Sequence, residues 1–131
     1  MVAYNFQKQF ADDVESGKKT QTIRKAGKRN PPKVGDALQL YTGMRTKSCR
    51  KLADVICTDI RVIKIVPKFG EVLLRLADGI NWVIIDSKHN LHQLALDDGF
   101  NSEEEFFAYF EKDTDENDMF HGHLIKWEPT K

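Results

Sequence analysis

The chain has 131 residues, of which 40% are hydrophobic and 31% charged, and its formal net charge is zero. This length predicts a single domain, 1–131, that can bury a hydrophobic core. No apolar run approaches the length that a bilayer requires, so we expect no membrane segment. The first residues lack the pattern of a secretory signal, and two cysteines do not make a disulfide framework. We therefore expect a cytoplasmic protein.

The zero net charge hides a strong asymmetry along the chain. A basic segment, 18–51, holds eleven Lys and Arg against one acid, whereas an acidic segment, 97–118, holds ten Asp and Glu against one base. One interpretation is an electropositive face that attracts phosphate groups. The other is that the two segments pack side by side and neutralise each other. The sequence favours neither interpretation.

An amphipathic helix is predicted near the N-terminus. Phe6, Phe10 and Val14 recur at helical spacing, and Asn5 is expected to cap the first turn. Gly17 stands where a helix ends in a left-handed residue, a conformation that glycine adopts without steric cost. The helix is therefore expected to end just before the basic segment.

A short strand is predicted from Thr20 to Arg24. Because side chains alternate along a strand, Thr20, Thr22 and Arg24 share one face, and Gln21 and Ile23 share the other. Ile23 is expected to point into the core. The opposite face, with two hydroxyls and a guanidinium, is suited to binding or reacting with a polar ligand.

The middle of the chain predicts strands separated by turns and basic loops. Asp78 and Gly79 are typical of a hairpin turn, because both residues tolerate a positive φ. Basic loops are expected at 25–36 and 43–51, and strands at 37–42, 52–66 (one long bent strand or two short ones), 72–76 and 81–85.

Two helices and a closing strand complete the prediction. A helix is expected at 88–98, ended by Gly99, and a second helix begins at Ser102. His123, Ile125 and Trp127 alternate in the last strand, and we expect Trp82 and Trp127 to lie in the core. This order of elements indicates an α+β fold, in which a small curled, mostly antiparallel β-barrel has flanking helices.

Histidine pairs offer a weak metal signal. His89 and His92 lie three residues apart on a predicted helix, and His121 and His123 lie two apart on a strand. Neither pair has a third ligand at a recognisable spacing, so we expect surface histidines, no metal and no cofactor.

Several of these motifs together resemble one protein family. The form Gly-x-Lys-x-x-Glu/Thr-x-Arg is matched by Gly17, Lys19, Thr22 and Arg24. Supporting matches are Val-Gly-Asp at 34–36, Tyr-Thr-Gly-Met-Arg-Thr-Lys at 41–47, Asp-Gly-Phe at 98–100 and the ending 122–127. The ordered set resembles the ASCH domain, a member of the PUA-like β-barrel superfamily, over nearly the whole chain.

The resemblance implies work on RNA or on a modified nucleotide. Some ASCH proteins are described as RNA-binding, and one bacterial subgroup is an amidohydrolase that removes the acetyl group from N(4)-acetylcytidine. Thr22, where many relatives have Glu, makes this chain similar to that subgroup. Its catalytic lysine, threonine and acid then correspond to Lys19, Thr22 and Asp98, with Asp97 as the alternative acid. The subgroup has a glutamate there, and an aspartate reaches one methylene less far.

In this hypothesis Thr22 attacks the acetyl carbonyl and Lys19 takes its proton. A lysine acts as a base only if its pKa is lowered, and crowding among Lys18, Lys19 and Arg24 would lower it. Asp98 or a backbone amide would assist the leaving amine. Arg24 would hold a base edge, a carboxylate or a phosphate through its planar guanidinium.

The other hypothesis is a module that binds RNA or a nucleotide without catalysis. The basic loops would follow phosphates while the cleft holds a base, and the residues expected to bind are Lys18, Thr20, Arg24, Lys25, Arg29, Arg45 and Lys47. Structural interpretations stay open, since Lys18 complements a helix dipole, threonines favour strands and Arg24 can pair with an acid. The acidic segment is also a candidate surface for a protein partner.

Overall fold

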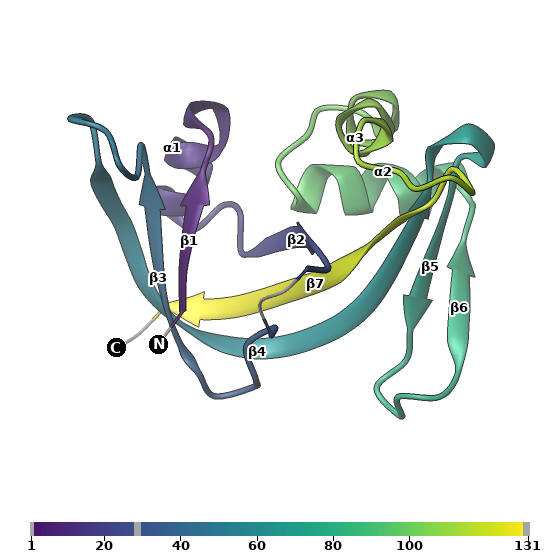
Figure 1. The fold of residues 1–131 in the computed structure, drawn as a ribbon, viewed down its shortest axis with the longest axis horizontal. Coiled ribbons are helices and arrows are strands. Elements are labelled where there is room, and N and C mark those ends of the chain that lie inside the picture. The colour runs from purple at the N-terminus through teal and green to yellow at the C-terminus, as the bar shows by residue number, and fades with distance from the viewer. Residues whose placement is uncertain (1, 28–29, 130–131) are drawn as a thin grey trace.

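The computed structural model describes residues 2–27 and 30–129. In chain order the elements are β1 (Val2–Phe6), α1 (Lys8–Ser16), β2 (Gln21–Lys25), β3 (Ala37–Thr42), β4 (Arg50–Val66), the 3-10 turn η1 (Pro67–Phe69), β5 (Glu71–Arg75), β6 (Trp82–Ile85), α2 (Lys88–Asp97), α3 (Glu103–Glu111) and β7 (Phe120–Pro129). The helices lie over the concave side of a strongly curved sheet (Figure 1).

The strands form one curled, mixed sheet. Its main path runs β1-β3-β4-β5-β6, and β7 pairs with both β4 and β2. The β1–β3 pair is parallel and the other pairs are antiparallel. The expected fold class is confirmed: the protein is α+β, with a curled half-barrel, mostly antiparallel, and flanking helices.

The start of the chain differs from the prediction. Residues Val2 to Phe6 form β1, in which Tyr4 pairs with Leu40 of β3. The first helix therefore begins at Lys8, Gln7 takes the cap position without a side-chain hydrogen bond, and the cap predicted at Asn5 is wrong. The helical spacing of the apolar residues gave no sign of this strand, because pairing with β3 is a tertiary contact. The predicted end is correct, since Gly17 has a φ of 84°.

One uninterrupted long strand, β4, lies at the centre of the sheet. β4 runs from Arg50 to Val66 and pairs with β3, β5 and β7 along its length. Its register with β7 shifts between Cys57 and Asp59, and such an irregularity increases the local twist of a strand. The single long bent strand, rather than two short ones, is the observed form (Figure 1).

Helix α3 and the α2–α3 connection pack against the rest of the fold through aromatic residues. Phe106 and Phe110 of α3 are buried, and the ring of Phe110 lies 4.8 Å from that of Phe120 on β7. Phe100, between the two helices, packs edge-on against Phe10 of α1 at 5.3 Å. This aromatic cluster fixes the α2–α3 connection beside the α1–β2 turn.

The two tryptophans differ in position. Trp127 is 4% exposed and lies in the core, as predicted. Trp82 is half-buried at the edge of the sheet, with the cations of Lys64 and Arg75 at 4.8 and 4.9 Å from its ring, so its predicted core position is wrong. Across 2–27 and 30–129, no helix combines the length and apolar character needed to cross a membrane.

Candidate functional site

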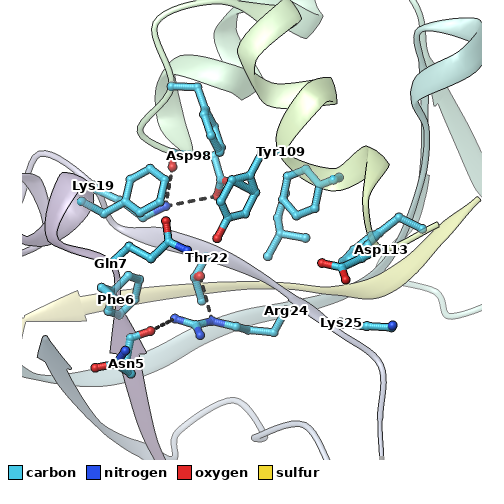
Figure 2. A pocket seen from close by; sticks show the side chains of 15 residues that line it. Asn5, Phe6, Gln7, Lys19, Thr22, Arg24, Lys25, Asp98, Tyr109 and Asp113 are labelled. Carbon is cyan, nitrogen blue, oxygen red and sulfur yellow. Dashed lines mark hydrogen bonds and ion pairs between the residues drawn. The ribbon is translucent and has the colours of Figure 1, made fainter. Parts of the chain in front are cut away.

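A cavity of about 340 Å³ opens where the end of β1, the α1–β2 turn and β2 face α2 and α3. Side chains from both groups of elements line the cavity, among them Lys19, Thr22, Arg24, Asp98 and Tyr109 (Figure 2). Lys19 and Asp98 are 79 residues apart in sequence. The fold therefore brings one part of the basic segment and one part of the acidic segment to a shared site.

Lys19 lies in the turn before β2, as predicted, and its side chain is buried. The residue is 3% exposed, and its backbone amide donates to the carbonyl of Asp13 in α1. Its ammonium nitrogen Nζ lies 4.9 Å from the ring centroid of Phe10 and donates to the backbone carbonyl of Asp98. The same atom lies 3.3 Å from Oδ1 of Asp98. The α1–β2 turn thus places a lysine against the end of α2.

Asp98 is the C-cap of α2 and is 3% exposed. Its Oδ1 accepts a second hydrogen bond, 3.3 Å long, from Nε2 of Gln21. The next residue, Gly99, has a φ of 95°, and a Cβ there would lie 2.9 Å from the ring of Phe10 and 3.3 Å from Cδ of Lys19. A glycine at this position therefore permits the end of α2 to approach Phe10 and Lys19 closely.

Burial moves the pKa values of the pair towards each other. Desolvation lowers the pKa of Lys19, while the charge and hydrogen bond of Asp98 oppose that shift. Desolvation likewise raises the pKa of Asp98, opposed first by the charge of Lys19. For Lys19, burial is the larger cause; of the two cations predicted to crowd it, Arg24 also lowers its pKa, whereas Lys18 is exposed. Bringing the two pKa values together makes proton transfer between these groups less costly than it is in water.

Thr22 and Arg24 share a face of β2, as the alternation predicted. Nε of Arg24 donates to Oγ1 of Thr22 at 3.1 Å, and its Nη2 donates to the backbone carbonyl of Asn5 at 2.8 Å. The guanidinium also lies 4.9 Å from the ring of Tyr4 and 4.8 Å from that of Phe6. These contacts fix Arg24 between β1 and β2.

The arrangement bears on the chemistry of Thr22. A cationic donor on Oγ1 stabilises the oxygen as it loses its proton, which favours a nucleophile. Nζ of Lys19 is engaged with Asp98, and Lys19 and Thr22 form no hydrogen bond with each other in the described chain. A base–nucleophile contact between them requires the Lys19 side chain to move.

The remaining predicted residues lie at three kinds of position. Lys25 lines the cavity, and Arg45 lines a neighbouring hollow that it shares with Arg24. Lys18, Thr20 and Lys47 are exposed and do not line the cavity. Arg29 lies outside the described residues.

Of the two candidate acids, the cavity contains Asp98. Asp97 is exposed, and its carboxylate accepts from Nε2 of Gln93 on α2. The predicted histidine pairs do not line this cavity, and the described residues hold no cluster of three His, Cys, Asp or Glu side chains suited to a metal ion.

Two residues near this site were not predicted to take part in it: Tyr109, which lines the cavity, and Gln21, which does not line it but donates to Asp98. Gln21 belongs to the other face of β2, yet it reaches Asp98. Tyr109 follows Phe106 at helical spacing in the apolar stripe of α3, and it lines the cavity. The phenol of Tyr109 was the signal available, because a hydroxyl in an apolar stripe needs a partner or access to water.

Comparisons with protein-family models, with curated proteins and with solved structures returned no match for this chain.

Proposed function

We propose that this chain is an ASCH-type domain whose cavity binds one nucleotide unit, either a residue of an RNA strand or a modified nucleotide. The observation that carries the proposal is the composition of the cavity. A buried Lys19–Asp98 pair and the Arg24–Thr22 contact supply polar groups, while Phe6 and Tyr109 supply aromatic surface. A few fixed polar groups on an aromatic wall are typical of sites for planar ligands.

The size of the cavity supports one unit rather than a long strand. A volume of about 340 Å³ lies near the lower end of the range for small-molecule sites. The neighbouring hollow, lined by Arg24 and Arg45, offers a cationic surface for an adjoining phosphate. An RNA ligand would place a base in the cavity and its backbone beside Arg45.

Binding of a short fluorescently labelled RNA over a salt series tests this proposal. We expect Arg45→Ala to weaken binding and to lower the slope of log K against log salt by about 0.7, the loss of one phosphate contact with a single strand. Lys88→Ala is a matched control, because Lys88 is exposed at the start of α2 and lines neither of these hollows. Absence of binding of both RNA and cytidine 5′-monophosphate to the wild type would overturn the proposal.

A second candidate is hydrolysis of N(4)-acetylcytidine in the same cavity. The observation that favours it is the hydrogen bond from Arg24 to Oγ1 of Thr22, which stabilises that oxygen as it loses its proton. Burial also lowers the pKa of Lys19, so this lysine loses its proton more readily than a lysine in water. Thr22 would attack the acetyl carbon, Lys19 would take the hydroxyl proton, and the C–N bond would break with proton return to the amine. Water would release acetate from the acetyl-threonine.

Deacetylation followed by chromatography tests the second candidate. We expect turnover by the wild type and by Thr22→Ser, which keeps the hydroxyl, and none by Thr22→Val or Lys19→Met. The rate should rise with pH through the pKa of Lys19, because the neutral amine is the base. No turnover by the wild type at high enzyme concentration would remove this candidate and leave the binding proposal standing.

A further inference from the structure

Tyr109 reaches the cavity from α3, on the side opposite β2. Its ring is fixed by edge-on packing against Phe100 at 5.2 Å, Phe110 at 5.2 Å and Phe10 at 6.0 Å. The residue as a whole is half-buried. A ring held on three sides has little freedom to move, so its hydroxyl is a fixed feature of the cavity wall.

The hydroxyl of Tyr109 points into the cavity, towards the side on which Gln7 and Thr22 lie (Figure 2). Within residues 2–27 and 30–129 it makes no hydrogen bond. Burial raises the pKa of Tyr109, so the group stays a neutral phenol at physiological pH and keeps its proton to donate. Among the aromatic residues that line this cavity, tyrosine alone carries such a group.

The opposite wall of the cavity carries a second hydroxyl, that of Thr22. Oγ1 of Thr22 accepts from Arg24, so its own proton is directed elsewhere. No described acceptor takes that proton. Two O–H donors on facing walls are suited to a ligand that presents acceptors, such as the carbonyl oxygen of a planar ring.

We infer that Tyr109 is the ligand-contacting residue of the helical wall, and that its hydroxyl donates to a ring carbonyl of the bound nucleobase. The inference rests on the proposed function and narrows it to carbonyl-bearing bases. Cytosine, uracil and guanine have such a carbonyl, whereas adenine lacks one. The site should therefore prefer a cytidine nucleotide to an adenosine nucleotide.

Titration calorimetry with cytidine 5′-monophosphate and adenosine 5′-monophosphate tests the inference. Tyr109→Phe keeps the ring and its packing and removes only the hydroxyl. We expect a five- to tenfold loss of affinity for the cytidine nucleotide, the worth of one hydrogen bond, and a smaller loss for the adenosine nucleotide. Tyr41→Phe is the matched control, since its hydroxyl bonds Gln39 outside the cavity.

A second readout separates contact from a structural effect. The chain has three tyrosines, so protein labelled with ¹³C at tyrosine Cζ gives three signals that the Phe variants assign. Ligand should shift the Tyr109 signal and leave that of Tyr41 in place, and thermal unfolding should show both variants folded. Equal affinity of Tyr109→Phe and wild type, with no shift at Tyr109, would overturn the inference and leave the binding proposal intact. Failure of the wild type to bind either nucleotide or RNA would overturn both.

Discussion

The cavity and the β5–β6 hairpin both depart from the usual distribution of side chains, but in opposite ways. The cavity buries ionisable side chains, and the hairpin exposes apolar ones. In the cavity, Lys19 and Asp98 are each 3% exposed although both are ionisable. On the hairpin, Ile80 is 77% and Ile84 is 56% exposed although both are apolar. Burying an ion pair costs desolvation energy that the pair's attraction seldom exceeds, so stability does not explain the cavity. Local rules are broken most often at functional sites, and a buried ion pair that lines a cavity is such a departure.

The turn of the hairpin is held by contacts within its own short segment, and β5 also pairs with β4. Asp78 accepts hydrogen bonds from the backbone amides of Ile80 at 2.8 Å and Asn81 at 2.9 Å, and Gly79 has a φ of 73°. Trp82 packs beneath Arg75, its partner in the ladder. In contrast, the cavity depends on residues that are distant in sequence. Changes in the cavity should therefore affect the whole fold more strongly than changes in the hairpin.

The largest expected effect is that of Asp98→Ala. Removal of the carboxylate leaves the Lys19 ammonium buried without its counter-charge, and breaking a buried pair in this way costs about 3–5 kcal/mol. Urea unfolding followed by circular dichroism measures the loss. The double variant Lys19→Met, Asp98→Leu should recover most of the stability, because it removes both charges and fills the space with apolar atoms.

Asp97→Ala is the matched control for that experiment. Asp97 is the exposed neighbour on the same helix, and we expect a change within about 0.5 kcal/mol. Equal effects of the two alanine variants would mean that the buried pair has no special role, and the contrast between cavity and hairpin would then fail.

Substitution of one glycine in each region, Gly122 near the cavity and Gly79 in the hairpin, compares the two regions directly. A Cβ at Gly122 on β7 would overlap the carbonyl oxygen of Arg24 and lie 2.7 Å from the ring of Phe120. Gly122→Ala should therefore lower the free energy of unfolding by about 1–3 kcal/mol. It should also disturb the pairing of β7 with β2, the strand whose residues line the cavity. At Gly79 a Cβ meets nothing within 4 Å, and only its positive φ opposes alanine.

Gly79→Ala should cost about 1 kcal/mol, the lower end of the strain of a left-handed residue. Chemical denaturation gives both values, and binding of cytidine 5′-monophosphate by the two glycine variants shows whether the cavity is disturbed. A larger loss for Gly79→Ala than for Gly122→Ala would reverse the comparison.

The sequence predicted the hairpin better than the cavity, for a physical reason. Asp78 and Gly79 act on their immediate neighbours, so their pattern was sufficient to place β5 and β6 within one residue of the observed bounds. The strand β1 was missed because its pairing with β3 depends on a segment over thirty positions away in the chain. The same applies to Trp82, whose burial depends on the sheet edge.

For the cavity, the alternation along β2 correctly paired Thr22 with Arg24, and Asp98 was named with Asp97 as its alternative. The choice between those two acids needed the end of α2, where one carboxylate faces inward and the other outward. Tyr109 and Gln21 needed the packing of α3 and of β2 against the α2–α3 connection. Periodicity shows which face of an element is apolar, but it does not show which residue of another element lies opposite.

The smallest expected effect is the acid dependence of the hairpin turn. Hydrogen bonds from Asn81 and Ile80 hold the pKa of Asp78 below its usual value. A carboxyl with a depressed folded-state pKa contributes stability above its unfolded pKa, and that contribution is lost as the pH falls through the folded value.

Asp78→Asn keeps an oxygen acceptor but removes the charge. The stability difference between wild type and Asp78→Asn should therefore be present at neutral pH and shrink at about pH 3. Urea midpoints at the two pH values measure it, with Asp86→Asn as the control, because the Asp86 carboxylate accepts no hydrogen bond within the described chain. A difference that stays constant with pH would show that the charge of Asp78 does not stabilise this turn, and local electrostatics would then not explain the hairpin.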